Sequence, residues 1–205
     1  MISRKKIAVI STGNGGQSMA AYLSALGYET ALYAREQERV DMFPDRKFEL
    51  HGVVEGVCEV SMISCNMAEV IEGAYLIMVT TPAQYAAKAV APVMAKHLKD
   101  GQMVVLNPGR TLGAHVFRHA LQNNGCIADI ILAETDTFVF TCRCLSVGHP
   151  NIYAIKTGVN VAALNPEDTP RVAAALSDLF PGIREAESVL HTDLSNIGTI
   201  GRAHV

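Results

Sequence analysis

Near its amino terminus the chain reads Lys6-Ile7-Ala8-Val9-Ile10-Ser11-Thr12-Gly13-Asn14-Gly15-Gly16. The apolar run 6–10 predicts a β-strand, and a helical pattern follows at 17–26, before Gly27. Glycine lets a backbone turn sharply and approach a ligand closely, and a helix N-terminus offers free N–H groups to an anion. A strand, a glycine-rich turn and a helix in this order predict a site for the pyrophosphate of a dinucleotide.

The turn departs from the G-x-G-x-x-G template at one position. Ser11 occupies the first glycine position, Gly13 the second and Gly16 the third. Serine is small enough for such a turn, so the prediction of a phosphate-binding turn stands. The alternative is an ordinary strand-to-helix loop whose glycines only allow tight packing. The candidate cofactor-binding residues here are Ser11, Gly13, Asn14, Gly15, Gly16 and Gln17.

The end of the next strand bears on the choice of cofactor. The run 29–33 predicts this strand, and Ala34 and Arg35 follow it where an acidic residue usually binds the free 2′-hydroxyl of NAD. A guanidinium pairs well with a 2′-phosphate, so the sequence favours NADP over NAD. Alternatively, Arg35 is a solvated surface charge, and Glu36 or Glu38 binds the ribose of NAD.

The composition excludes several classes of protein. The 205 residues are 49% hydrophobic, enough for a large buried core, and the formal net charge of −3 argues against nucleic acid as a partner. The apolar run after Arg4-Lys5-Lys6 is too short for a signal peptide, and no run is long enough to span a membrane. We therefore expect a cytoplasmic protein without a membrane partner; a homodimer is left open.

The cysteines and histidines lack the spacing of metal-binding motifs. Cys142 and Cys144 alternate on a predicted strand, so they could form a redox or soft-metal pair. Buried, reduced thiols are the simpler interpretation, because free cysteine commonly packs as a small apolar residue. No CxxC motif and no HExxH motif occurs, so we predict no metal site.

Strands and helices alternate through the first 135 residues. Further strands are expected at 74–79, 103–106 and 130–133, and helices at 36–43, 84–98 with a bend at Pro92, and 112–122. The strand-like runs 138–145, 151–155 and 159–164 follow with short connections, and a helix is expected at 166–180. This order predicts an α/β fold with a doubly wound, Rossmann-type parallel sheet, extended by antiparallel strands.

The carboxyl ends of parallel strands form the ligand-binding edge of such a sheet. Besides the glycine-rich turn, the loops 80–83, 107–111 and 134–135 follow predicted strands, and we expect all four loops to line one crevice. This edge adds to the cofactor-binding candidates Thr81, Pro82, Asn107, Pro108, Gly109 and Glu134. As alternatives, Asn-Pro-Gly is a common turn sequence, and Glu134 could only cap the next segment.

These segments together resemble the NAD/NADP opine dehydrogenases, the octopine dehydrogenase-like family. The matching segments, in order, are Gly13-Asn14-Gly15-Gly16, Leu106-Asn107-Pro108-Gly109, Ala133-Glu134-Thr135-Asp136-Thr137, Arg143, Lys156, Ala162-Ala163-Leu164 and Asp193-Leu194-Ser195-Asn196-Ile197-Gly198. The resemblance covers nearly the whole chain. It implies an oxidoreductase that joins the amino group of an amino acid to a 2-oxo acid and reduces the imine with NAD(P)H.

The resemblance also assigns roles near the carboxyl terminus. Asn196 and a histidine are the implied catalytic residues, but Arg202 stands where the family has its histidine, and His204 follows two residues later. Either His204 takes the acid/base role, or that histidine is displaced, absent or part of a frayed terminus. Arg143 either holds a substrate carboxylate or is a solvated strand-end charge.

The resemblance implies a division of the chain at about residue 187. Residues 1–187 would form the dinucleotide-binding domain, and 188–205 only the start of a helical substrate domain. On this interpretation the chain alone turns over weakly or not at all. The alternatives are a related two-domain reductase, acting on ketopantoate or glycerol phosphate, and a dinucleotide-binding module without catalysis.

Overall fold

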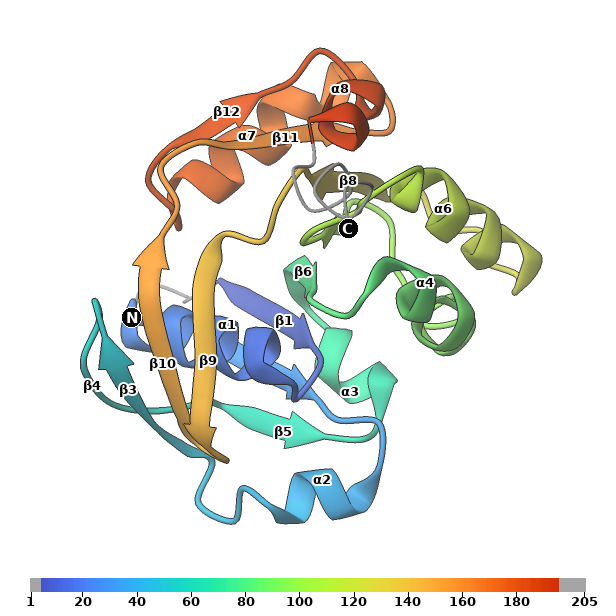
Figure 1. The fold of residues 1–205 in the computed structure, drawn as a ribbon. Helices are drawn as coiled ribbons and strands as arrows, with labels where there is room; N and C mark the ends of the chain where they lie inside the picture. Colours follow the sequence, from blue (N-terminus) through green and yellow to red (C-terminus); the bar gives the residue numbers. More distant parts are fainter. Residues whose placement is uncertain (1–4, 196–205) are drawn as a thin grey trace, which may run out of the picture. The chain divides into compact units, whose positions relative to one another are not determined.

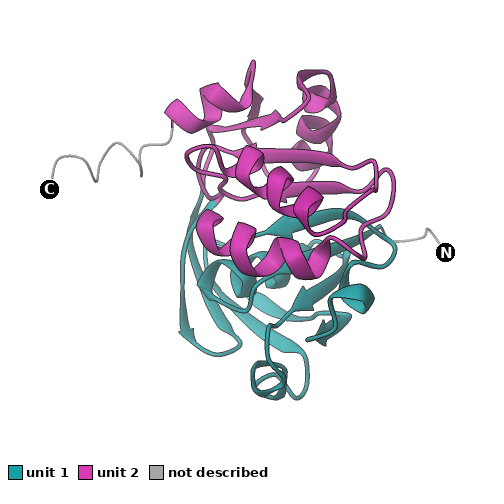
Figure 2. Cartoon of the chain, turned by 90° about the vertical axis from the view of Figure 1, so that its right-hand side faces the viewer, with its two compact units in different colours: residues 1–81, 140–155 teal, residues 82–139, 156–205 magenta. Residues whose placement is uncertain are grey.

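The computed structural model describes residues 5–195 of the chain. The chain divides into two compact units, shown in different colours in Figure 2. Unit 1 comprises Met1–Thr81 and Phe140–Ile155, and unit 2 comprises Pro82–Val139 and Lys156–Val205. Among residues 5–195, no helix combines the length and the apolar character needed to cross a membrane.

Unit 1 contains three parallel strands that the apolar runs predicted, β1, β2 and β6, and a fourth, β5, that was not predicted. They lie in the order β6-β1-β2-β5, and each neighbouring pair is parallel. Their inner residues are buried, as expected for strands covered on both faces. The bounds are β1 (Lys6–Ile10), β2 (Glu29–Tyr33), β5 (Met62–Ser64) and β6 (Ala74–Val79). The helices of this unit are α1 (Asn14–Ala25), α2 (Gln37–Asp41) and α3 (Met67–Ile71).

A second sheet in unit 1 corrects one prediction. Two of the late strands do not extend the parallel sheet; they join two earlier strands in a separate sheet of order β4-β3-β10-β9 (Figure 1). The link is a parallel pairing of β10 with β3, between segments far apart in the sequence. The bounds are β3 (Lys47–Gly52), β4 (Gly56–Glu59), β9 (Phe140–Ser146) and β10 (His149–Ile155).

Helix α1 packs against both sheets of unit 1. It contacts β1 and β2 of the parallel sheet as well as all four strands of the second sheet. Every residue from Gly16 to Leu23 is consequently buried, and several of these are small residues such as Ser18 and Ala20. A helix covered on all sides carries no polar stripe, because no side of it faces water.

Unit 2 continues the alternation of strands and helices. β7 and β8 are parallel, β8 pairs antiparallel with β11, and β11 is parallel to β12. Antiparallel extension is therefore confirmed for β11 alone among the three late strands. The strands are β7 (Met103–Leu106), β8 (Ile131–Thr135), β11 (Val159–Ala163) and β12 (Ile183–Glu185), the last of which the sequence did not predict.

The helices of unit 2 differ from the predictions mainly around Pro92. The single helix expected at 84–98 is divided, and a π-helical turn lies immediately before the proline segment. Pro92 has no N–H to donate to a carbonyl one turn back, so the regular ladder is interrupted there. The helices are α4 (Ala83–Tyr85), η1 (Ala86–Val90), α5 (Ala91–Met94), α6 (Gly113–Asn123), η2 (Pro166–Asp168), α7 (Thr169–Ser177) and α8 (Val189–Leu194).

Candidate dinucleotide site

The turn between β1 and α1 requires small residues at the positions the template assigns to glycine. Ser11, at the first position, has a φ of 141°, a backbone conformation that favours glycine. A Cβ atom on Gly16 would lie 1.8 Å from the carbonyl oxygen of Ser11, so only glycine fits there. Gly13 is the N-cap of α1, and no side chain caps this helix. The first N–H groups of α1 are thus left for an anion.

Two polar side chains attach this turn to the second sheet. Gln17 donates from Nε2 to the carbonyl oxygen of Thr12 at 2.8 Å, and its Oε1 accepts from the N–H of Gly148 at 2.9 Å. Asn14 Oδ1 accepts from the N–H of Cys144 at 2.9 Å. Both were predicted to bind the cofactor; the structure engages their side chains within the protein, where they hold the turn in place.

The end of β6 lies against the end of β1. Thr80 donates to the carbonyl oxygen of Ile10 from its backbone N–H at 3.3 Å and from Oγ1 at 3.2 Å. The hydroxyl of Thr81 is buried and has no hydrogen-bond partner within residues 5–195. A buried hydroxyl without a partner is costly, so Thr81 is a good candidate for a ligand contact. Pro82, in unit 2, is the exposed N-cap of α4.

The residues after β2 contain both a cation and an anion. Arg35 forms an ion pair with Glu36 and donates from Nε to Glu36 Oε1 at 2.8 Å. Both side chains are more than half exposed. The guanidinium is thus positioned for a 2′-phosphate, but a carboxylate that could bind a ribose hydroxyl lies beside it. Both sequence-based alternatives for the cofactor therefore remain physically reasonable.

In unit 2, the loop after β7 carries a buried asparagine. Asn107 is completely buried, and its Oδ1 accepts from the N–H of Val139 at 3.2 Å. Its Nδ2 has no hydrogen-bond partner in the part of the chain that the structure describes. The peptide bond to Pro108 is cis. An amide donor without a partner, next to the carboxyl end of a parallel strand, fits the predicted role in ligand binding.

Glu134 lies directly under this loop, at the carboxyl end of β8. A Cβ atom on Gly109 would lie 2.1 Å from Glu134 Oε2, so the loop backbone packs on the carboxylate. Oε2 accepts from the N–H of Ala114 at 2.8 Å, in the first turn of α6, and Oε1 accepts from Thr192 Oγ1 at 2.7 Å. Glu134 therefore accepts from the first turn of the preceding helix α6, not from the segment that follows it, and links α6 to α8.

The environment of Glu134 favours the protonated form of its carboxyl group. Burial raises the pKa of its carboxyl to about 8, although the hydrogen bonds from Thr192 and Ala114 oppose this shift. The neighbouring Asp193 raises this pKa further, and Asp193 itself accepts from the N–H of Leu112 at 2.9 Å. No local pattern identifies Thr192 as a partner of Glu134, because the two residues are 58 positions apart in the chain.

The proposed substrate residue Arg143 lies on the outer face of the second sheet. On β9 the sulfur atoms of Cys142 and Cys144 lie 4.0 and 3.9 Å from the carbonyl oxygen of Asn14. Arg143 lies between them and, because side chains alternate along a strand, points to the opposite face. It is exposed there, whereas the two cysteines are half-buried free thiols. Burial raises the pKa of Cys144 to about 11, with a contribution from Cys142.

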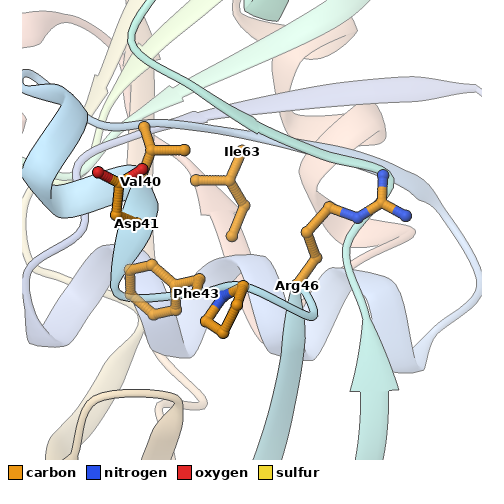
Figure 3. A pocket seen from close by; sticks show the side chains of 6 residues that line it. Val40, Asp41, Phe43, Arg46 and Ile63 are labelled. Atoms are coloured by element: carbon orange, nitrogen blue, oxygen red, sulfur yellow. The ribbon is translucent and has the colours of Figure 1, made fainter.

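Two predicted catalytic residues, Asn196 and His204, lie outside the described residues. Elsewhere in unit 1, a pocket of about 370 Å³ is lined by residues of α2, β5 and the loop before β3 (Figure 3). Its cation, Arg46, already pairs with Glu59 at 2.8 Å. Its other labelled residues are Val40, Asp41, Phe43 and Ile63, and none belongs to the glycine-rich turn.

Comparison with known proteins agrees with this geometry. Residues 6–111 match the family described as the NAD binding domain of 6-phosphogluconate dehydrogenase. An opine dehydrogenase from Arthrobacter sp. (strain 1C) is 30% identical over 203 residues, which are 98% of this chain and 56% of that protein. The chain therefore spans about half the length of this curated relative.

Two solved structures share the fold. Octopine dehydrogenase with NADH and pyruvate has a TM-score of 0.81 at 17% identity, over 96% of this chain and 53% of that one. Yersinopine dehydrogenase with bound NADP+ has a TM-score of 0.69 at 15% identity, over 92% of this chain and 49% of that one. The matched family covers the strand, turn and helix on which the dinucleotide site was predicted. This chain belongs to the NAD-binding domain family of 6-phosphogluconate dehydrogenase, as a Rossmann-type domain related to the opine and octopine dehydrogenases.

Proposed function

We propose that the chain is the cofactor-binding part of an NAD(P)H-dependent opine dehydrogenase. Such an oxidoreductase condenses the amino group of an amino acid with a 2-oxo acid and reduces the product to a secondary amine dicarboxylate. The observation that carries the proposal is the 30% identity to an opine dehydrogenase along almost the whole chain. The geometry of the glycine-rich turn supports the cofactor part of it.

The proposed cofactor contacts are argued for each unit by itself. In unit 1 the N–H groups at the start of α1 hold the pyrophosphate, since Gly16 lets the helix begin directly against Ser11. The hydroxyl of Thr81 supplies a further polar contact in the same unit. In unit 2 the free amide donor of Asn107 is a separate candidate for a ligand contact. The bound cofactor supplies the hydride for the reduction.

For the cofactor, we favour NADPH over NADH. Arg35 is exposed at the carboxyl end of β2, where the 2′-substituent of the adenosine ribose is expected. A phosphate dianion attracts a guanidinium more strongly than a single carboxylate does, so it can displace Glu36 from Arg35. NADH would instead use Glu36 as the acceptor for its ribose hydroxyl.

The substrate side of the proposal depends on fewer observations. His204 and Asn196 are the proposed catalytic residues, with the histidine exchanging protons near neutral pH. Arg143 is the proposed cation for a substrate carboxylate, and its exposure leaves its guanidinium accessible. Each role rests on the resemblance to the opine dehydrogenases.

The experiment has a binding step and a reaction step. Calorimetric titration of the 205-residue chain with NADPH and NADH tests the cofactor site, for which we expect one site per chain. Oxidation of NADPH is then followed with a 2-oxo acid, with an amino acid, and with both. We expect oxidation, however slow, only with both, and a secondary amine product by mass spectrometry. Oxidation of NADPH by a 2-oxo acid without any amine would refute the opine activity, and the absence of saturable binding of either cofactor would refute the cofactor site.

A further inference from the structure

Three potential metal ligands lie together on the outer face of the second sheet. Along β3 the side chains of Phe48 and Leu50 are buried, so those of Glu49 and His51 point outward. Along β10, Pro150 and Ile152 are buried, and His149 points outward in the same way. Since β3 and β10 are paired, as Figure 1 shows, the three outward side chains meet across the pair.

The candidate donor atoms of this cluster, Glu49-His51-His149, face one another. His51 Nε2 lies 3.4 Å from His149 Nδ1. The Glu49 carboxylate is 3.5 Å from His149 Nδ1 and 3.9 Å from His51 Nε2. The imidazole rings are stacked, with centroids 5.7 Å apart and planes inclined by 22°. One donor atom from each of the three residues thus lies within 4.8 Å of the other two.

These separations match those of ligands around a tetrahedral metal ion. Zinc binds imidazole nitrogen and carboxylate oxygen at about 2.0–2.2 Å, which places neighbouring tetrahedral ligands about 3.3–3.5 Å apart. His149 Nδ1 lies 3.4 Å from His51 Nε2 and 3.5 Å from Glu49 Oε2, which are separations of this size, whereas the 3.9 Å separation from His51 Nε2 is to the other carboxylate oxygen, Glu49 Oε1. Two imidazoles and a carboxylate, with a fourth position left to water, are a common donor set for zinc and similar ions.

We propose that Glu49, His51 and His149 form a binding site for a divalent transition metal ion of the zinc type. The side chains are 52%, 33% and 43% exposed, so an ion reaches them from solvent without any opening of the fold. Glu49 contributes negative charge that offsets the charge of the ion. The cations on this face include Lys47, two residues before Glu49 on β3, and Arg143, which lies opposite Asn151, itself the partner of His51 in the sheet.

The backbone holds the ligands in place before any ion binds. The N–H of Glu49 donates to the carbonyl oxygen of Gly148 at 2.9 Å, next to His149. Glu49 is thus hydrogen-bonded to the residue before His149, and His149 begins β10 beside a register irregularity. The spacing of histidines in the sequence predicted no metal, because His51 and His149 lie 98 residues apart.

Titration of the untagged, chelator-treated chain with ZnCl₂ tests the site, with Co²⁺ absorption as a second probe of tetrahedral geometry. We expect one Zn²⁺ per chain. His51→Ala and His149→Ala should each lower the affinity by more than about 100-fold, because loss of even an outer-sphere partner costs about 10- to 100-fold. Glu49→Gln keeps the shape of the side chain and should also weaken binding.

The matched control is His115→Ala, which removes an exposed histidine from α6. It should leave the Zn²⁺ affinity unchanged, and circular dichroism should show that every variant is folded without metal. The proposal is overturned if the unmodified chain shows no saturable Zn²⁺ binding. It is equally overturned if the three ligand variants bind like the unmodified chain, or if His115→Ala loses as much affinity as they do.

Discussion

A Cβ atom on Gly16 would lie 1.8 Å from the carbonyl oxygen of Ser11, far inside van der Waals contact. The obstacle is backbone, so it cannot move aside as a flexible side chain would. This close approach lets α1 begin directly above the end of β1, with its first N–H groups uncapped. The same relationship makes the turn sensitive to a single methyl group.

Gly16→Ala should therefore damage both stability and cofactor binding. Overpacking of this kind costs about 1–3 kcal/mol of unfolding free energy. Displacement of the helix N-terminus should weaken NADPH binding by about 10- to 100-fold, the loss of one or two hydrogen bonds to a charged group. Urea denaturation and calorimetric titration measure the two effects. Gly158→Ala is the control, because a Cβ there makes only ordinary contacts of 3.6 Å and longer with Arg184.

Gln17→Ala should destabilise the turn without removing any of the backbone N–H groups proposed to bind the pyrophosphate. The variant leaves the buried N–H of Gly148 without an acceptor and the carbonyl oxygen of Thr12 without a donor. An unsatisfied buried group costs about 1–3 kcal/mol, so the unfolding free energy should fall by that amount. Gln122→Ala, at an exposed position of α6, should have almost no effect in the same denaturation experiment. Equal stability of the two variants would mean that Gln17 does not support the turn.

Arg35→Ala tests the cofactor preference. If the guanidinium binds the 2′-phosphate, NADPH affinity should fall by about 10- to 100-fold while NADH affinity stays the same. Glu36→Gln should have the opposite effect on NADPH, because it releases Arg35 from its ion pair. Arg39→Ala on α2 is the control for charge alone. Equal affinities for the two cofactors in the unmodified chain would refute the preference.

Glu134 should make the protein less stable as the pH rises. Its pKa is raised to about 8 in the folded chain, against 4.5 as the ordinary value, so the folded state binds the proton more tightly. The stabilisation is complete below about pH 4.5 and is lost as the pH rises to about 8. Glu134→Gln, which is neutral at every pH, should flatten this slope in urea denaturation between pH 5 and about 8.5. The exposed Glu167→Gln should leave the slope as it is.

The local sequence predicted the central strands well, for a physical reason. β1, β2 and β6 have the predicted bounds, because strands covered on both faces read as continuous apolar runs. The glycine-rich turn could also be predicted from the local sequence. The contacts that require glycine at Gly13 and Gly16 are made with Ser11, within the same short segment. Ser11 fits the template because its backbone takes up the positive φ that the position requires.

Contacts between segments far apart in the chain could not be predicted, because they leave no pattern in the local sequence. The pairing of β3 with β10 creates the second sheet, and nothing in either strand identifies the other as its partner. The same holds for Glu134 and Thr192, so the local sequence could not predict the hydrogen bonds that link Glu134 to α6 and α8. Gln17 was likewise found bonded to Gly148, in a strand connection that lies far along the chain.

A crystal structure of the chain with NADPH tests the central claim most directly. We predict that the pyrophosphate oxygens lie within hydrogen-bond distance of the backbone N–H groups at the start of α1, beside Gly16. Dinucleotide bound away from this turn, or pyrophosphate oxygens with no contact to those N–H groups, would contradict the account.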